Sequence, residues 1–530
     1  MDVQRLYSAF LECGRVTTDS RVISGGEMFF GLKGENFDGN EYALKALEAG
    51  ARYAVVDEGT AAATSGDPRV VVVPDTLEAL QALARHHREN TFVDGKRLTV
   101  IGLTGTNGKT TTKELITRVL SVKYNVTSTQ GNLNNDIGVP LSVLNINSKT
   151  QIAVIEMGAS HPDDIEKLVK VCEPDYGLIT NVGKAHLLGF GSFEGVKKAK
   201  GKLYDYISEH GGSIFLNADD ENLVAMAAER KGLNVIEYGI GYWNAMVLPS
   251  DAEHPFVRMA IPNPVASLVA STGSATEDSP VPEPVEGPLV RQCSPTSDAT
   301  ESTENTESMG STENTDSTES TDSTENLLCF ETNLAGAYNA NNIAAAIAVG
   351  LHFGVSLEDA IQAVSEYIPK NNRSQLEKTD RNILIEDAYN ANPTSMAAAL
   401  DNLATVQAAH KAVMIGDMRE LGTESVAEHI AILKKLALMD LDLVCLVGEE
   451  FRKALDSEQM VRQARHPFAL GAEPVARQCS PTSEVSPSNT KWFPTSDDLV
   501  TWLKSNPISN HTILIKGSRG IRMEKILPGL

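Results

Sequence analysis

The chain has 530 residues, of which 42% are hydrophobic, 22% charged and 5% aromatic. At roughly 100–200 residues per domain, that length predicts about three domains that each bury a core. The formal net charge of −24 argues against a nucleic-acid-binding surface and against a polybasic membrane anchor. No CxxC pair is present, and no apolar run approaches the roughly 18 residues of a membrane helix. We therefore expect a soluble, cytoplasmic protein that binds neither nucleic acid nor membrane. We also expect it to be a monomer.

Strand-like apolar runs alternate with helical periodicity along most of the chain, which predicts an α/β fold. The first domain boundary is expected near Asp94-Gly95, before the run LTVIGL, and the second near Pro369, after LEDAIQAVSEYI. The expected domains are therefore residues 1–95, 96–369 and 370–530.

The N-terminal block contains two polar turns within TDSRVISGGEMFFGLKGENFDGNEY. The residues there that could contact a ligand are Ser20, Arg21, Asn36, Phe37, Asp38 and Gly39. Ser-Arg pairs and Gly-rich loops also occur in ordinary turns, so residue chemistry alone leaves both interpretations open.

The strongest local signal is LTVIGLTGTNGKTTTKELITRVL, where an apolar strand expected over 98–103 runs through a Gly-rich turn into a helix. The turn and the first helical positions are Gly105, Thr106, Asn107, Gly108, Lys109, Thr110 and Thr111. Glycines let backbone N–H groups converge on phosphate oxygens, and a helix N-terminus adds partial positive charge. We expect Lys109 to neutralise the β- and γ-phosphates of ATP and Thr110 to ligate Mg²⁺. The alternative is a Gly-rich turn without function.

Two further strands of the central block end in groups that suit a metal ion. QIAVIEMGAS carries Glu156 at its carboxyl end, and YGLITNVGKAH leads to His186. Ligands of parallel α/β sheets bind at the carboxyl ends of strands, and a carboxylate with an imidazole near a phosphate loop suits Mg²⁺. Taken alone, His186 could instead be a structural histidine. GNLNNDIGVPLSVL adds Asn132, Asn134 and Asn135, which are either ligand contacts or turn and cap residues.

After Pro369, four strand-like runs each deliver a polar residue or glycine at their carboxyl ends. These residues are Asp387, Asp417, Gly448 and Lys516. Asn392 followed by Pro393 is a helix start, with Asn at the N-cap and Pro at N1. The pattern predicts a Rossmann-like domain with one functional edge, and the lack of GxGxxG after its first strand argues against a dinucleotide.

Two stretches have the composition of surface insertions. Residues 264–326 are rich in Pro, Ser and Thr and end in DATESTENTESMGSTENTDSTESTDSTEN, which has no Lys or Arg. Such low-complexity composition predicts disorder. The heptapeptide RQCSPTS occurs at 291–297 and again at 477–483, within a polar loop expected over 472–490. It is either a docking motif or two copies of an inserted element.

TGTNGKTTT resembles the ATP loop of the Mur ligase family, which also includes folylpolyglutamate synthetases, and the resemblance extends along most of the chain. It implies three α/β domains: a uridine-nucleotide-binding domain, a central P-loop ATPase-like parallel sheet and a C-terminal Rossmann-like domain. ITNVGKAHLLGFGSFEGVKKAKGKLYD resembles the family's metal-binding segment. The resemblance implies a carbamylated Lys200 and two Mg²⁺ ions held with Thr110, Glu156 and His186. Family members usually carry Glu two residues later, where this chain has Lys202.

The resemblance also implies roles for the remaining candidates. Lys109, Lys200 and His186 would be catalytic. LAGAYNANNIAAAIAVG resembles the adenine-side motif and places Asn339 and Asn342 at ATP, together with Arg373 and Asp387. The N-terminal set would bind the uridine nucleotide, and Asn132, Asn134 and Asn135 would approach the sugar-peptide substrate. The meeting point of the substrates would be lined by Tyr389, Asn390, Asn392, Lys516 and Arg519.

DAYNANPTSM and KGSRGIRME resemble the branch of the family that joins D-alanyl-D-alanine to UDP-N-acetylmuramoyl-tripeptide through an acyl phosphate, in peptidoglycan precursor synthesis. ATP-dependent ligation is therefore the expected activity. One alternative is a folylpolyglutamate synthetase-like ligase. Another is a P-loop switch or scaffold protein that uses nucleotide to control partners through its acidic tract.

Overall fold

The computed structural model describes residues 2–34, 36–249, 256–263, 291–292, 327–369, 375–465 and 489–530. The insertion expected over 264–326, apart from 291–292, lies outside the described residues, as does the polar loop 472–490 up to residue 488. The predicted nucleotide contact Arg373 also lies outside them.

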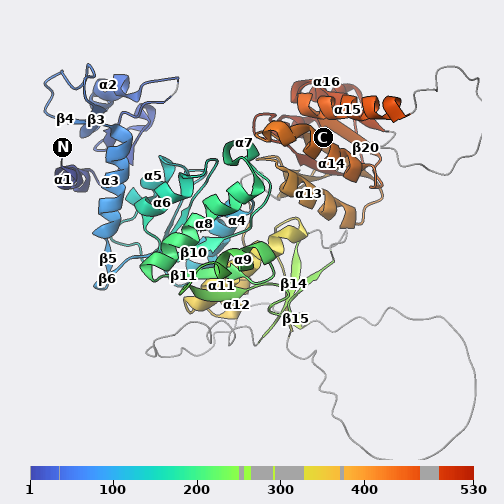
Figure 1. Ribbon diagram of the computed structural model, residues 1–530, viewed down its shortest axis with the longest axis horizontal. Coiled ribbons are helices and arrows are strands. Elements are labelled where there is room, and N and C mark those ends of the chain that lie inside the picture. Colours follow the sequence, from blue (N-terminus) through green and yellow to red (C-terminus); the bar gives the residue numbers. More distant parts are fainter. Residues whose placement is uncertain are drawn as a thin grey trace, which may run out of the picture.

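The N-terminal block is built on a parallel four-stranded sheet in the order β1-β2-β3-β4. Its strands are β1 (Val16–Thr17), β2 (Met28–Phe30), β3 (Tyr53–Asp57) and β4 (Val70–Val73). Its helices are α1 (Val3–Cys13), η1 (Ser20–Val22), η2 (Gly39–Tyr42), α2 (Ala43–Glu48) and α3 (Thr76–Glu89). A short hairpin, β5 (Phe92–Val93) and β6 (Lys96–Arg97), follows α3. Figure 1 shows this block at one end of the molecule.

Helix α3 attaches the N-terminal block to the central sheet. Arg88 on α3 is fully buried, forms an ion pair of 2.9 Å with Asp175 and donates a hydrogen bond to the carbonyl of Cys172. Loss of Asp175 would leave the buried charge of Arg88 without its partner, so this contact favours one orientation of the helix.

The central block holds a parallel six-stranded sheet in the order β12-β11-β10-β7-β9-β8. Its strands are β7 (Thr99–Thr104), β8 (Val126–Ser128), β9 (Ile152–Glu156), β10 (Tyr176–Ile179), β11 (Ser213–Asn217) and β12 (Asn234–Tyr238). The helices around it are α4 (Lys109–Leu120), α5 (Gly138–Leu144), α6 (Asp164–Cys172), α7 (Leu187–Phe190), α8 (Phe193–His210), α9 (Glu221–Ala228), η3 (Ala337–Asn339), α11 (Ala340–His352) and α12 (Leu357–Ser365).

Alternating side chains of the central strands enter two cores, one on each face of the sheet. Val100 and Ile155 pack on one face with α5, α6 and α8. Ile101 and Val154 pack on the other with α4, α11 and α12. Because side chains alternate along a strand, this double burial explains why these strands are apolar without interruption.

An antiparallel sheet that the sequence did not predict lies beside the central sheet, in the order β13-β14-β16-β15. Its strands are β13 (Met246–Leu248), β14 (Arg258–Pro262), β15 (Arg291–Gln292) and β16 (Leu327–Glu331). Pro262 at the end of β14 pairs with Leu327 at the start of β16. The two ends of the insertion therefore begin from neighbouring positions in this sheet.

The C-terminal block is a six-stranded sheet in the order β17-β18-β22-β19-β20-β21, in which only β17 is antiparallel. Its strands are β17 (Gln375–Lys378), β18 (Ile383–Asp387), β19 (Lys411–Gly416), β20 (Leu443–Val447), β21 (Thr490–Phe493) and β22 (Thr512–Lys516). Its helices are α13 (Pro393–Thr405), η4 (Gly422–Glu424), α14 (Ser425–Leu436), α15 (Glu449–Arg465), α16 (Ser496–Ser505) and η5 (Met523–Gly529). The four predicted strands are present, and β17 and β21 are added at the two edges.

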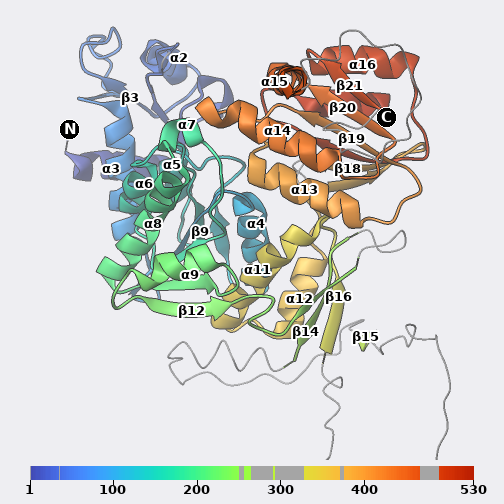
Figure 2. The ribbon, with the colours of Figure 1, turned by 45° about the vertical axis from the view of Figure 1, so that its right-hand side comes forward.

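The three-layered C-terminal block stands over the central sheet with α13 and α14 facing it (Figure 2). None of the helices in the described residues is both long enough and apolar enough to cross a membrane.

Candidate functional site

A cavity of ≈ 970 Å³ lies where the carboxyl ends of the central strands face the C-terminal block. It is lined by eighteen of the residues singled out in the sequence: Thr106, Asn107, Gly108, Lys109, Thr110, Thr111, Asn132, Asn134, Asn135, Glu156, His186, Asn339, Asn342, Asp387, Tyr389, Asn390, Asn392 and Lys516. Strand order explains the convergence, because β7, β9 and β10 are neighbours and deliver their following loops to one edge.

Two glycines of the phosphate loop allow neighbouring groups to approach closely. Gly105 has φ 153°, and a Cβ there would lie 1.9 Å from the Thr180 hydroxyl oxygen. Gly108 has φ 79°, and a Cβ there would lie 2.5 Å from Oδ1 of Asn342. L-residues rarely adopt these φ values, so both the backbone and the space require glycine. The loop is thereby held against the strands and against α11.

The ammonium group of Lys109 lies over the phosphate loop. Its Nζ donates hydrogen bonds to the carbonyls of Gly105, at 2.7 Å, and Thr106, at 3.1 Å. The charge therefore sits at the N-terminus of α4, where the helix dipole also attracts anions. This arrangement can bind a phosphate chain.

Glu156 is fully buried at the end of β9 and has a polar surrounding suited to a cation. Its Oε1 accepts hydrogen bonds from Asn134, at 2.7 Å, and from the Thr110 hydroxyl, at 3.2 Å. Its Oε2 has no hydrogen-bond partner among the described residues, and Nζ of Lys113 lies 4.0 Å away. A buried carboxylate oxygen without a hydrogen bond is costly unless a cation approaches it. The residues present therefore fit an oxygen-ligated ion such as Mg²⁺.

Lys200 on α8 is 2% exposed, and its Nζ donates a 3.0 Å hydrogen bond to the carbonyl of Gly105. Burial, followed by the nearby charge of Lys109, lowers the pKa of Lys200 well below its ordinary value. Burial therefore favours the neutral, nucleophilic form of this amine. Lys202, which stands where the family usually has Glu, points elsewhere and forms a 3.3 Å ion pair with Glu166.

The sequence predicted that His186 lies at the carboxyl end of a strand. The structure instead places it in the loop after β10, at the start of α7. Its backbone is left-handed, with φ 51°. Its Nδ1 pairs with the carboxylate of Glu420 from the C-terminal block. Burial lowers the pKa of His186, as do the charges of Lys109 and Lys200, while Glu420 opposes the shift. The imidazole therefore lies at the domain junction, near both lysines.

The predicted adenine-side amides form a chain of buried hydrogen bonds. The Thr112 hydroxyl donates to Oδ1 of Asn342 at 3.0 Å, and Asn342 donates to Oδ1 of Asn339 at 2.8 Å. Asn339 in turn donates to the carbonyl of Ala335 at 2.8 Å. These contacts fix the start of α11 against α4, while both asparagines still line the cavity.

The C-terminal block contributes a buried cation to the cavity. Lys516, at the end of β22, is 1% exposed and pairs with the carboxylate of Asp387. Its Nζ also donates to the carbonyl of Asn390 at 3.1 Å. Arg519 stacks over the ring of Tyr389 at 5.5 Å but is not among the lining residues. Strands β18 and β22 are neighbours, so Asp387 and Lys516 meet at equivalent positions.

The predicted N-terminal contacts do not line this cavity. Arg21 is largely exposed and forms a 2.7 Å ion pair with Asp19, and Phe37 is 63% exposed. Ser20 begins the short helix η1, Asn36 is exposed and Asp38 caps η2. Gly39 is required by close packing, since a Cβ there would lie 2.5 Å from the Leu32 carbonyl oxygen. Gly39 is buried, and the other five residues are at least partly exposed on the N-terminal block.

Several cavity residues were not predicted. Asp219 and Asp220 follow β11 and line the cavity, so the strand-end rule would have found them. Glu420 does not line the cavity but pairs with His186, and no such signal predicts it, because the two residues lie in loops of different blocks.

Comparison with known proteins decides the family. The Mur ligase catalytic domain matches residues 13–88, the Mur ligase middle domain 103–254 and the glutamate ligase domain 372–519. UDP-N-acetylmuramoyl-tripeptide--D-alanyl-D-alanine ligase of Bacillus subtilis is 31% identical over 97% of this chain and 92% of its own. The chain belongs to the Mur ligase family.

Two more relatives cover nearly all of this Mur ligase. The Escherichia coli enzyme with the same name is 30% identical over 99% of this chain and 95% of its own. A crystal structure of MurF from Acinetobacter baumannii has a TM-score of 0.73 and 26% identity, covering 99% of this chain and 97% of its own. The three-domain α/β architecture is therefore that of a solved Mur ligase.

Proposed function

We propose that this Mur ligase uses ATP to join D-alanyl-D-alanine to UDP-N-acetylmuramoyl-tripeptide in the synthesis of peptidoglycan precursors. The observation that carries the proposal is similarity over almost the whole chain to two ligases of that name, at 31% and 30% identity. The cavity supports it, because a phosphate loop on one block faces polar groups of another across a space of ≈ 970 Å³.

The first step activates the tripeptide. A carboxylate is a poor electrophile, so its oxygen attacks the γ-phosphorus of ATP, the bond to the β–γ bridging oxygen breaks, and ADP leaves. Lys109 and the amides at the start of α4 stabilise the charge on the transferring phosphoryl group. Asn339 and Asn342 would contact the base of the nucleotide.

The second step forms the amide. The amine of D-alanyl-D-alanine attacks the acyl carbon, and the tetrahedral intermediate expels phosphate that retains one oxygen of the original carboxylate. Tyr389, Asn390 and Lys516 face this space from the C-terminal block. Positioning two reactants in one cavity supplies much of the rate enhancement, and exclusion of water there would protect the acyl phosphate from hydrolysis.

Thr110, Glu156 and His186 would hold Mg²⁺, which when bound neutralises phosphate charge. We propose that Lys200 carries a carbamate and completes a second site. Burial supports this proposal because it lowers the pKa of Lys200, and only a neutral amine attacks CO₂. The resulting carbamate is an anion whose oxygen atoms can ligate a metal ion. Nζ of Lys200 lies 3.0 Å from the Gly105 carbonyl, beside the phosphate loop.

The uridine nucleotide is assigned to the exposed N-terminal surface. Arg21 and Phe37 offer a cation and an aromatic face, which suit a phosphate and a base. Ser20, Asn36, Asp38 and Gly39 complete this set. The substrate would then reach from that surface to the cavity, passing Asn132, Asn134 and Asn135.

The test is phosphate release from the purified chain with ATP and Mg²⁺, adding the UDP-linked tripeptide and D-alanyl-D-alanine singly and together. We expect release only with both, and a product heavier by the dipeptide. Release that instead requires a folate and glutamate would identify the alternative ligase. Nucleotide binding without substrate-stimulated release would contradict ligase activity.

A further inference from the structure

Two histidines and an aspartate converge at the amino ends of strands in the C-terminal sheet, on the side opposite the cavity. His410, Asp442 and His511 immediately precede β19, β20 and β22. These strands are adjacent and parallel, and the register pairs Lys411 with Thr512 and Ala412 with Leu443. The topology therefore brings three separate segments together at one end of the sheet.

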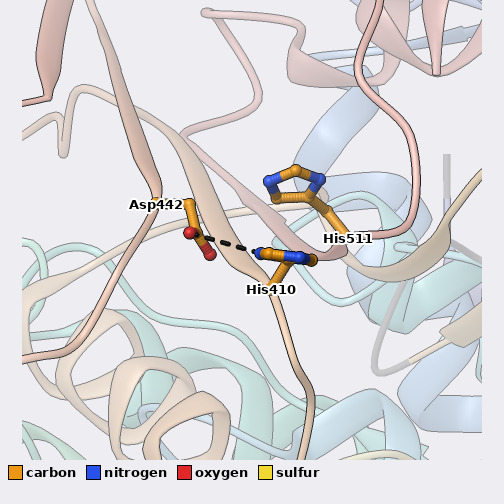
Figure 3. Close-up of side chains that lie close together, drawn as sticks. All are labelled: His410, Asp442 and His511. Carbon is orange, nitrogen blue, oxygen red and sulfur yellow. Dashed lines mark hydrogen bonds and ion pairs between the residues drawn. The ribbon is translucent and has the colours of Figure 1, made fainter.

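The donor atoms of the three side chains lie within 4.8 Å of one another. Nδ1 of His410 is 3.4 Å from Oδ1 of Asp442, and the two imidazole rings are 5.3 Å apart between centroids. Figure 3 shows both rings beside the carboxylate, with ring nitrogens directed toward it. Donor atoms of a tetrahedral zinc site lie roughly 3.3 Å apart, given bonds of about 2.0–2.1 Å. His410 and Asp442 are exposed enough for the small side-chain rotations that would close the set.

Neighbouring backbone groups hold two of the three donors in position. Nδ1 of His511 donates to the carbonyl of Ser509 at 2.7 Å, which assigns its lone pair to Nε2. Oδ2 of Asp442 accepts the backbone N–H of Lys411 at 2.8 Å, which leaves Oδ1 directed at the histidines. Hydrogen bonds of this kind orient metal ligands and fix their tautomers.

We propose that His410, Asp442 and His511 bind a divalent transition-metal ion, with Zn²⁺ as the expected occupant. Two imidazoles and one carboxylate form a borderline-soft donor set that suits Zn²⁺ better than Mg²⁺ or Ca²⁺. Water fills the remaining coordination position of this exposed site. The ion binds the starts of β19, β20 and β22 to one another.

The site is structural and separate from ligation. Strand β19 runs from Lys411, beside the metal site, to Gly416, on the side of the cavity. At about 3.3 Å per residue, the ion therefore lies roughly 15–20 Å from the cavity. Metal binding here stabilises the folded C-terminal block without contacting the substrates. Binding and thermal stability are therefore the appropriate readouts.

The test is titration of the chelator-treated full chain with Zn²⁺ in excess Mg²⁺, followed by calorimetry and by the melting temperature Tm. The variants are His511→Ala and Asp442→Asn, in which Asn retains an oxygen for the Lys411 N–H. The control is His210→Ala, which removes an exposed histidine stacked on Tyr206. Co²⁺ provides a second readout through its visible absorption.

We expect the wild-type chain and His210→Ala to bind Zn²⁺ alike and to gain several degrees in Tm. Both site variants should lose at least ~10-fold in affinity and the gain in Tm, because each removes one of three protein ligands. If His511→Ala fails to fold, Asp442→Asn decides alone. Equal Zn²⁺ affinity in wild type and Asp442→Asn, or no Zn²⁺ binding by the wild type, would overturn the proposal.

Discussion

The side-chain amide of Asn392 donates a 2.7 Å hydrogen bond to Oδ1 of Asn107, which joins the start of α13 to the phosphate loop. Oδ1 of Asn392 meanwhile accepts the backbone N–H of Ser395 and caps the helix. One residue thus fixes a helix of the C-terminal block and contacts the phosphate loop. Closure of the two blocks and the shape of the phosphate loop are therefore connected through this amide pair.

Asn392→Ser separates the two roles. Serine is a good N-cap, so stability should change by no more than about 0.5 kcal/mol, whereas the donor to Asn107 is lost. We expect kcat/KM to fall about 10-fold, in line with the loss of one buried polar contact. Asn392→Ala should lose the same activity and also about 1 kcal/mol of stability. Activity of Asn392→Ser equal to wild type would show that the contact with Asn107 does not matter.

Lys109→Ala should lower ligation by at least ~10², because preorganised charge at a transferring phosphoryl group contributes that much. Steady-state kinetics of Lys109→Ala, measured beside a control variant on the same helix, provide the check. Arg118→Ala is the matched control, since Arg118 lies on the same helix but pairs with Glu366 at 3.0 Å on the surface. Comparable activity of the two variants would refute the assignment of the phosphate loop.

Lys200→Ala should be nearly inactive and should recover part of its activity when small carboxylates are added to replace the carbamate. Lys202→Ala, two residues away on the same helix, should retain activity because Lys202 only pairs with Glu166. Rates measured with and without acetate distinguish a missing carboxylate from a damaged fold. Full activity of the unrescued Lys200→Ala protein would remove Lys200 from the metal site.

Glu27 should make the N-terminal block sensitive to acid. Hydrogen bonds from Ser24, together with backbone N–H groups including that of Gly25, lower the pKa of Glu27 to about 2. A lowered folded-state pKa contributes stability above the unfolded value of about 4.5, and that stability is lost as pH falls toward about 2. Glu27→Gln should cost about 1–3 kcal/mol at neutral pH, since the O–H and N–H groups that donate to Glu27 lose a charged acceptor.

Melting curves between pH 7 and pH 2 measure this effect. The stability difference between wild type and Glu27→Gln should be constant at neutral pH and shrink below about pH 4.5. Glu41→Gln is the control, because Glu41 is an exposed carboxylate of the same block. A difference that stays the same down to pH 2 would contradict the role of the ionised Glu27 carboxylate.

Replacing residues 298–326 with a short Gly-Ser linker should leave Tm and turnover almost unchanged. The composition of that tract offers almost nothing that could enter a core. Pro262 and Leu327 are paired in the antiparallel sheet, so both sides of the insertion already lie together. Loss of stability or turnover in the shortened chain would assign the tract a structural or regulatory role.

Local patterns predicted the parts of the site that lie within single segments. The phosphate loop followed from glycines between an apolar strand and a helix, and the start of α13 followed from Asn392 and Pro393. Strand-end residues such as Glu156 and Lys516 were predicted because parallel strands bring their carboxyl ends to one edge. Each of these inferences needs only periodicity and the propensities of a few adjacent residues.

Contacts between blocks could not be predicted in the same way. The pairing of His186 with Glu420 depends on how the C-terminal block is placed over the central sheet, which no local pattern encodes. The antiparallel sheet was missed because β14 and β16 are separated by the long insertion. Strand β17 was missed because an edge strand with the sequence QLEK lacks a continuous apolar run.

The fate of one carboxylate oxygen tests the central claim most directly. UDP-N-acetylmuramoyl-tripeptide labelled with ¹⁸O in its terminal carboxylate is incubated with ATP, Mg²⁺, D-alanyl-D-alanine and the purified chain, and the released phosphate is analysed by mass spectrometry. Ligation through an acyl phosphate predicts that each phosphate formed with the dipeptide-extended product carries one ¹⁸O atom. Unlabelled phosphate accompanying that product would contradict the acyl phosphate, and the absence of product would contradict the ligase activity itself.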